Sequence, residues 1–287
     1  MAPPMPEVEG VEHHWVEVNG FRMHYAEAGE GEPVVLVHGW PQHWWAWRHQ
    51  IPALAERYRV IVPDLRGYGW SDAPRSGYDK PQFAADVLAL MNELGLEKAR
   101  LAGHDWGATA TFILGLENPE RFERLVPVAN VPPWRKGPPP PTLLLFLTYQ
   151  SLVSSPVLGA YVMRNGLASA MLKRGRGSGE WTQEELDTYE GPWREPGHDN
   201  AGVQTYRTLL TKELPAALAG GGFGKGGNLT VPTTLIMGSK DLLKHGLQPE
   251  VYERKGPIRT VYVDGAGHWL MEEKPDETTA HLLEAFA

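Results

Sequence analysis

The sequence predicts an α/β protein whose mostly parallel sheet is flanked by helices and interrupted by a helical insertion. Short apolar runs alternate with stretches of helical spacing along most of the 287 residues, as expected of strands joined by right-handed crossovers. Runs such as 34–37 and 59–62 are continuously apolar, which is typical of strands buried on both faces. The alternation stops at residues 132–229. Prolines at 138–141 near the start of this segment and glycines at 219–227 near its end set it apart from the rest of the chain.

The first part of the chain supplies most of the predicted strands. Asn19-Gly20 joins two alternating runs, and this dipeptide strongly favours a hairpin turn, so an antiparallel pair begins the sheet. Parallel strands and helices then alternate. The predicted strands are 15–18, 21–27, 34–37, 59–62, 99–102 and 125–128, and the predicted helices are 45–56, 81–94 and 108–116.

The insertion and the end of the chain complete the architecture. A capping-box pattern starts one helix of the insertion at Thr182, and Asp199 or Asn200 starts a second. Strands 233–237 and 258–263 bring the sheet to eight strands, and an amphipathic helix follows at 275–286. The predicted organisation is a core at 1–131, a helical lid at 132–229 and the rest of the core at 230–287.

Composition excludes several classes of function. The net charge is −8 and the chain has no cysteine, which argues against a nucleic-acid partner and removes thiolate and disulfide chemistry. The histidines outside the strand ends show no metal-ligand spacing, so we expect no metal. The N-terminal residues lack a basic start and an apolar run, and no apolar stretch reaches about 18 residues. We therefore expect a cytoplasmic protein without a membrane partner, either a monomer or a homodimer.

Asp105 lies at the tip of a predicted strand, sharp turn and helix. Gly103 and Gly107 flank it, where a tight elbow leaves no room for a Cβ and forces the tip residue towards positive φ. The turn places the carboxylate beside the free N–H groups of the helix start, which favour negative charge. Such an aspartate is either an exposed nucleophile or simply the N-cap of the helix.

Two later strand ends carry an acid and a base. Strand 233–237 runs into Asp241, and strand 258–263 runs into His268. Loops at the carboxyl ends of parallel strands form the edge of the sheet where ligands bind. The chain order of nucleophile, acid and histidine is that of a catalytic triad, with Asp105 in the position of serine. This order favours the nucleophile over the helix cap.

Three motifs resemble those of one enzyme family. HisGlyTrpPro at 38–41 looks like an oxyanion motif, GlyHisAspTrpGly at 103–107 looks like a nucleophile elbow, and residues 64–72 are similar to another signature of that family. The chain resembles the α/β-hydrolase superfamily over essentially its whole length, and within it the aspartate-nucleophile branch, most of all the soluble epoxide hydrolases. The resemblance implies the α/β-hydrolase fold, and it implies that the backbone N–H groups of Trp40 and Trp106 form the oxyanion hole.

A carboxylate nucleophile favours a particular chemistry. Attack on an acyl carbon would give an anhydride, whereas displacement at an sp³ carbon gives an ester, so ester and amide hydrolysis is disfavoured. Water must then attack the carbonyl carbon of Asp105, and His268, oriented by Asp241, is the natural general base. In the chain order that the resemblance implies, Asp64 lies on the wrong side of the elbow to be the acid of the triad, and Asn130 is not a carboxylate. No cofactor is needed.

The lid sequence helps to distinguish the two activities of the aspartate-nucleophile branch, which are epoxide hydrolysis and haloalkane dehalogenation. An epoxide oxygen leaves as an alkoxide, so an acid must face Asp105. The segments around Tyr149 and Tyr206 look like the two places where epoxide hydrolases carry their oxygen-activating tyrosine pair. Tyr161 and Tyr189 are expected to pack the lid against the core. The expected substrate-binding residues are Trp40, Trp106, Gln150 and Trp269.

The sequence therefore predicts an epoxide hydrolase that converts an apolar epoxide and water into a vicinal diol. The predicted intermediate is a covalent alkyl-enzyme ester on Asp105. A haloalkane dehalogenase with the same triad is an alternative, although those enzymes commonly have Asn where this chain has Trp40. A non-catalytic ligand-binding protein on the same fold is a second alternative.

Overall fold

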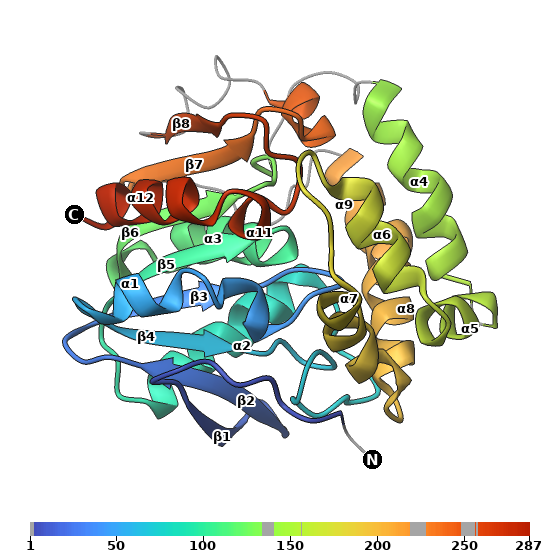
Figure 1. Cartoon of the computed structure of the whole chain (residues 1–287), viewed down its shortest axis with the longest axis horizontal. Helices are drawn as coiled ribbons and strands as arrows, with labels where there is room; N and C mark the ends of the chain where they lie inside the picture. The colour runs from blue at the N-terminus through green and yellow to red at the C-terminus, as the bar shows by residue number, and fades with distance from the viewer. Residues whose placement is uncertain (1–2, 134–140, 156, 219–227, 248–255, 257) are drawn as a thin grey trace.

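The computed structural model describes residues 3–133, 141–155, 157–218, 228–247, 256 and 258–287 (Figure 1). Residues 138–140 of the proline run and the whole glycine-rich segment 219–227 lie outside the described residues. Within them, eight strands form a single sheet in the order β1-β2-β4-β3-β5-β6-β7-β8. The strands are β1 Glu12–Val18, β2 Phe21–Ala28, β3 Glu32–Val37, β4 Tyr58–Pro63, β5 Ala99–His104, β6 Phe122–Val128, β7 Thr233–Gly238 and β8 Ile258–Val263.

The sheet is mostly parallel, as predicted. β1 pairs with β2 and β2 with β4 in antiparallel fashion, and all other neighbours are parallel. The hairpin closes with Val18 opposite Phe21, and both turn residues, Asn19 and Gly20, have positive φ. This is the backbone that the Asn-Gly dipeptide favours.

The helices follow the predicted alternation, with one difference. Residues 45–56 do not form one helix, because Pro52 has no N–H with which to bond the preceding turn. They form instead a 3₁₀ turn at Trp44–Trp47 and the short α1. The helices are α1 Ile51–Ala55, α2 Lys80–Glu93, α3 Trp106–Glu117, α4 Pro141–Val153, α5 Leu158–Arg164, α6 Leu167–Gly175, α7 Gln183–Glu190, α8 His198–Thr208, α9 Leu214–Leu218, α11 Leu270–Glu273 and α12 Pro275–Phe286.

Hydrophobic cores lie on both faces of the sheet. Along β3, Val34 and Leu36 pack in the core beneath α1 and α12, whereas Val35 and Val37 pack in the core beneath α2 and α3 (Figure 1). Alternate side chains of a strand point to opposite faces, so a continuously apolar run is the pattern that two covered faces require. The central strands are thereby packed on both faces, and this packing fixes the positions from which the loops at their carboxyl ends begin.

Helices α4 to α9 gather beside the carboxyl ends of the strands (Figure 1). The capping box predicted at Thr182 is present at the start of α7. α8 begins at His198, one residue before the first of the predicted starts, because Gly197 with φ 89° precedes it. A π-helical turn at Leu209–Glu213 then joins α8 to α9.

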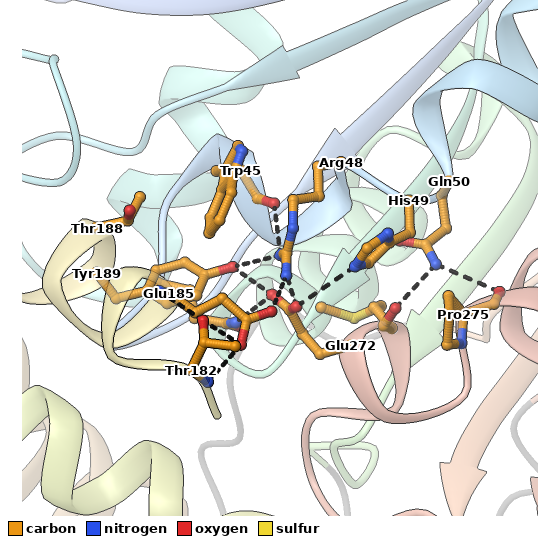
Figure 2. Close-up of polar contacts among 12 residues, drawn as sticks. Trp45, Arg48, His49, Gln50, Thr182, Glu185, Thr188, Tyr189, Glu272 and Pro275 are labelled. Carbon is orange, nitrogen blue, oxygen red and sulfur yellow. Dashed lines mark hydrogen bonds and ion pairs between the residues drawn. The ribbon is translucent and has the colours of Figure 1, made fainter. Parts of the chain in front are cut away.

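A buried polar cluster joins this helical segment to the core (Figure 2). The guanidinium of Arg48 lies 2.8 Å from Glu185 on α7 and 2.5 Å from Glu272 on α11, and the hydroxyl of Tyr189 donates to Glu272. Burial raises the pKa of Glu272, although Arg48 opposes that shift. Tyr189 therefore packs α7 against the core, as expected. The same expectation is wrong for Tyr161, whose side chain is 64% exposed on α5.

Asp64 is a structural carboxylate rather than a member of the candidate site. It is fully buried after β4 and accepts hydrogen bonds from His24 Nδ1 at 2.7 Å and from the backbone N–H groups of Trp44 and Trp70 at 2.7 and 2.9 Å. Burial alone would raise its pKa, but the neighbouring histidines, His24 first and then His43 and His38, lower the pKa to about 2. The carboxylate thus links β2, the 3₁₀ turn and the loop after β4.

Replacing Asp64 with alanine should lower the free energy of unfolding by about 3–5 kcal/mol, because buried donors lose their only charged acceptor. Urea denaturation at pH 7 measures the loss, with exposed Asp276→Ala as the control. Since the pKa of Asp64 is depressed in the fold, its contribution exists above the unfolded pKa and disappears as the pH falls towards 2. An unchanged denaturation midpoint at pH 7 would refute this assignment.

Candidate active site

The elbow at Asp105 has the geometry that its glycines predict. Asp105 connects β5 to α3 with φ 52° and ψ −113°, a backbone conformation that L-residues rarely adopt. A Cβ added at Gly103 would lie 2.2 Å from the carbonyl oxygen of Gly107, and one added at Gly107 would lie 2.4 Å from that of Val37. Glycine is therefore required at both positions for the turn to close.

Asp105 does not act as the cap of α3. Its side chain makes no capping hydrogen bond to the helix. Instead its Oδ1 accepts the backbone N–H of Trp40 at 3.0 Å. Gly39 allows this approach, since a Cβ there would lie 2.3 Å from the Cβ of Asp105. The alternative of a simple N-cap is thus wrong, because the carboxylate bonds to the N–H of Trp40 and makes no capping hydrogen bond to α3.

The three strand ends bring Asp105, Asp241 and His268 together. His268 Nδ1 lies 2.9 Å from Asp241 Oδ2, and His268 Nε2 lies 3.5 Å from Asp105 Oδ2. A carboxylate can only accept, so the imidazole donates to Asp241 and is oriented by it. Asp105 and His268 have side chains that are 14% and 15% exposed, whereas Asp241 is 3% exposed. Asp105 and His268 are thus accessible, and Asp241 is covered.

The charges around His268 favour its protonated form. Burial lowers its pKa, but the Asp241 and Asp105 carboxylates outweigh burial and raise the pKa to about 10. One of these two negative charges would vanish if Asp105 became an ester. The pKa of His268 would then fall, because a nearby negative charge is what stabilises the imidazolium.

One hydrogen-bond donor contacts the carboxyl group of Asp105, and a second belongs to the residue that follows Asp105 in the chain. The N–H of Trp40 already contacts Oδ1, and Trp106 is the first residue of α3, whose N–H has no acceptor within its own helix. These are the two groups named from sequence for the oxyanion hole. Such donors become most effective when negative charge develops on the oxygen.

Tyr149 of α4 and Tyr206 of α8 form a pair next to these donors. Their ring centroids are 5.6 Å apart and a hydrogen bond joins their side chains. Trp40 stacks on Tyr149 at 6.1 Å and meets Tyr206 edge-on at 5.0 Å. Burial raises the pKa of Tyr149 to about 12 and that of Tyr206 well above its ordinary value. Both hydroxyls are therefore neutral donors, and Trp40 links them to Asp105.

The remaining predicted substrate-binding residues fall into two groups. Trp106 contacts Tyr206 with ring centroids 6.0 Å apart, and Gln150 hydrogen-bonds the side chain of Tyr149, so both join the aromatic group beside Asp105. Trp269 is buried elsewhere. It packs edge-on against His268 at 4.6 Å, and its indole N–H donates to the carbonyl of Leu172 on α6. The contacts of Trp269 therefore hold the loop that carries His268 against α6.

Sequence reasoning missed the supporting role of Asn130. Asn130, at the end of β6, donates to the backbone carbonyl of Asp105 at 2.6 Å and to Thr109 at 3.1 Å. Asn after a strand is too common to identify this role. His104, the residue before Asp105, connects the elbow to the loop that carries His268, because its Nε2 donates to the carbonyl of His268 at 2.9 Å. Burial lowers its pKa to about 3, so it is a neutral structural residue.

Neither a metal centre nor a membrane span emerges from the part of the chain that the structure describes. No group of three His, Asp or Glu side chains there converges as metal ligands would. No helix among the described residues has the length and apolar character needed to cross a bilayer.

Comparison with known proteins places this geometry in a family. Residues 32–275 match the family described as alpha/beta hydrolase fold. The chain belongs to that family. The elbow, the acid after β7 and the histidine after β8 thus lie in an α/β hydrolase, as the sequence motifs indicated.

Relatives of this α/β hydrolase extend over nearly its whole length. It is 34% identical to a soluble epoxide hydrolase of Corynebacterium sp., with 96% of this chain and 98% of the relative covered. It is 35% identical to epoxide hydrolase A of Mycobacterium tuberculosis, with 94% and 95% covered. The solved structure of epoxide hydrolase CorEH without ligand superposes with a TM-score of 0.83 at 32% identity, covering 96% and 98%.

Proposed function

We propose that this α/β hydrolase is an epoxide hydrolase that converts apolar epoxides into vicinal diols. One observation carries the proposal: a hydrogen-bonded pair of neutral tyrosines lies beside the elbow aspartate, and Trp40 contacts all three residues. The proteins named epoxide hydrolases among its relatives add support. In this proposal residues 132–229 act as a lid between the core parts 1–131 and 230–287.

Ring opening is the first step. An oxygen of Asp105 attacks one epoxide carbon, and the bond from that carbon to the ring oxygen breaks. The leaving oxygen takes a proton from the hydroxyl of Tyr149 or Tyr206, which leaves a hydroxyalkyl ester on Asp105 and a tyrosinate. Burial makes each tyrosine a weak acid when alone. The hydrogen bond between the two stabilises the tyrosinate that forms.

Hydrolysis of the ester is the second step. Water attacks the carbonyl carbon of Asp105 while His268 accepts its proton, and the N–H groups of Trp40 and Trp106 stabilise the oxyanion. The acyl–oxygen bond then breaks, and the departing alkoxide takes the proton of the carboxylic acid formed on Asp105 and leaves as the diol. Ester formation lowers the pKa of His268 by removing the charge of Asp105. The imidazolium therefore gives up its proton after ring opening, the tyrosinate takes it up, and neutral His268 is available as the base for hydrolysis.

Isotope labelling tests the covalent route directly. Enzyme in excess is mixed with styrene oxide in ¹⁸O-water for a single turnover. The proposal predicts an unlabelled diol, because the oxygen added to the substrate comes from Asp105, and it predicts one ¹⁸O in the peptide that contains Asp105. A labelled diol in the first turnover would show direct attack by water, and no diol from any epoxide would refute the activity.

Tyr206→Phe should slow ester formation by about 10²-fold, because the leaving oxygen loses a proton donor. Rapid-quench intact mass spectrometry with styrene oxide gives the rate of ester formation. Tyr161→Phe is the matched control, since Tyr161 is exposed on α5. Equal rates in wild type and Tyr206→Phe would remove Tyr206 from the reaction.

Haloalkane dehalogenation is the second candidate. The indole N–H groups of Trp40 and Trp106 are buried and have no partner, and a halide leaving group needs such donors. Unpartnered indoles also occur at Trp44 and Trp47 in the core, so this observation weighs less than the tyrosine pair. Release of bromide from 1-bromohexane, without diol formation from epoxides, would favour the dehalogenase.

A further inference from the structure

Lys80 is a fully buried lysine close to the candidate active site. It is the first residue of α2 and its side chain is 0% exposed, which is rare for lysine unless the charge is paired. Its Nζ donates to Glu213 Oε2 at 2.7 Å and to the carbonyl of Thr205 at 2.9 Å. It also lies 4.3 Å from the ring centroid of Trp106. None of the mechanistic steps above uses this group.

The partners of Lys80 flank the residues that are proposed to react. Trp106 directly follows Asp105, and Thr205 directly precedes Tyr206. Glu213 ends the π-helical turn after α8, and π-helical turns occur frequently at functional sites. The carboxylate of Glu213 also accepts the backbone N–H of Lys80 at 2.7 Å. One ammonium group thus joins the start of α2, the nucleophile elbow and the segment that carries Tyr206.

The hydrogen bonds of this ammonium account for its orientation. A lysine ammonium has three N–H groups, and two are used by Glu213 and Thr205. The third is left for the face of Trp106, where the ring quadrupole attracts a cation. Burial lowers the pKa of Lys80, and the carboxylate of Glu213 opposes that shift. The charge is therefore held by specific partners on every side.

Stability alone does not explain such a pair. Well-packed apolar residues often replace a buried ion pair with no loss of stability, because desolvation of both charges offsets their attraction. What apolar residues do not reproduce is the directed contact of Nζ with the Trp106 ring and with the backbone beside Tyr206. Trp106 in turn meets the ring of Tyr206 at 6.0 Å. The pair therefore defines the relative positions of the elbow and this tyrosine.

We propose that Lys80, held by Glu213, is a positioning residue for epoxide ring opening. It fixes Trp106 against Tyr206, so that the tyrosine hydroxyl meets the leaving oxygen while Asp105 attacks. This inference rests on the proposed epoxide hydrolase activity. It predicts that loss of the ion pair slows formation of the ester but leaves its hydrolysis unaffected, because Asp241 and His268 hold the base through separate contacts.

The test compares the two steps in Lys80→Met/Glu213→Gln, a double variant in which both charges are removed and side-chain length is kept. Rapid-quench intact mass spectrometry after mixing with styrene oxide gives the rates of ester formation and hydrolysis. We expect ester formation to slow by about 10²-fold, the effect of a misplaced catalytic geometry, and hydrolysis to stay within about twofold. In case the first variant fails to fold, Lys80→Gln/Glu213→Gln is measured in parallel, and it too should slow ester formation while ester hydrolysis stays within about twofold.

Arg66 and Asp86 offer a matched control. They form another buried ion pair, with 2.5 Å between Arg66 Nε and Asp86 Oδ2, and Arg66 lies against the ring of Phe21 rather than against the aromatic residues beside Asp105. Arg66→Met/Asp86→Asn should change neither rate by more than about twofold, whatever its effect on thermal stability.

The outcomes separate the two proposals. If wild-type enzyme forms the ester and the Lys80 variant forms it at the same rate, or loses both steps equally, the positioning role is wrong and the activity stands. If wild-type enzyme forms no ester with any epoxide, the proposed activity is wrong, and the role of Lys80 falls with it. Selective slowing of ester formation in the Lys80 variant, with both steps unchanged in the Arg66 control, supports the proposal.

Discussion

Replacing Asp105 with asparagine should reduce epoxide turnover by about six orders of magnitude or more, to the level of the uncatalysed reaction. A neutral amide does not form the ester, so neither step can proceed. The fold should survive, because asparagine has nearly the same size and shape as aspartate and, like aspartate, tolerates a positive φ, which is 52° at the elbow. Diol formation measured by chromatography, together with a thermal unfolding curve, checks both statements.

A control for this variant is Asp276→Asn, which removes an exposed carboxylate at the start of α12. It should keep wild-type turnover. Turnover by Asp105→Asn within a hundredfold of wild type would mean that water attacks the substrate directly. Asp105 would then be at most a binding residue, and the covalent mechanism would be wrong.

His268→Gln is expected to lower kcat by about 10²–10⁴-fold, the usual contribution of a general base. Ester formation should continue, because the variant keeps Asp105, the Trp40 N–H and the tyrosine pair. The ester should therefore accumulate, and intact mass spectrometry should show an adduct with the whole mass of styrene oxide. The adduct should be absent from the double variant with Asp105→Asn.

His245→Gln provides the comparison for His268→Gln, since His245 is exposed and distant in the chain from the elbow. It should show no lasting adduct. Exposure of the same variants to 1-bromohexane separates the two candidate activities, because a hexyl adduct without any adduct from the epoxide would identify a dehalogenase. If His268→Gln forms no adduct from either compound, the covalent mechanism is contradicted.

Local patterns in the sequence were sufficient for most of the core. Asn19-Gly20 specified a hairpin, and Gly103 with Gly107 specified a sharp elbow at Asp105, because both depend on the backbone freedom of a few neighbouring residues. The order of strand ends predicted that Asp241 and His268 would meet Asp105, since parallel strands bring their carboxyl ends to one edge. The prediction of one helix at 45–56 was wrong for a local reason as well, because Pro52 interrupts it.

Only the tertiary structure decided how buried charges are paired and which aromatic residues meet. Lys80 and Glu213 are 133 residues apart in the chain, and Trp40 meets tyrosines from two separate helices. The tertiary structure also placed Tyr161 on the surface, whereas the sequence predicted that Tyr161 packs the lid against the core. Sequence periodicity describes the geometry of one element at a time. The partners of a buried side chain depend on how distant elements pack, and that information is not contained in any single segment.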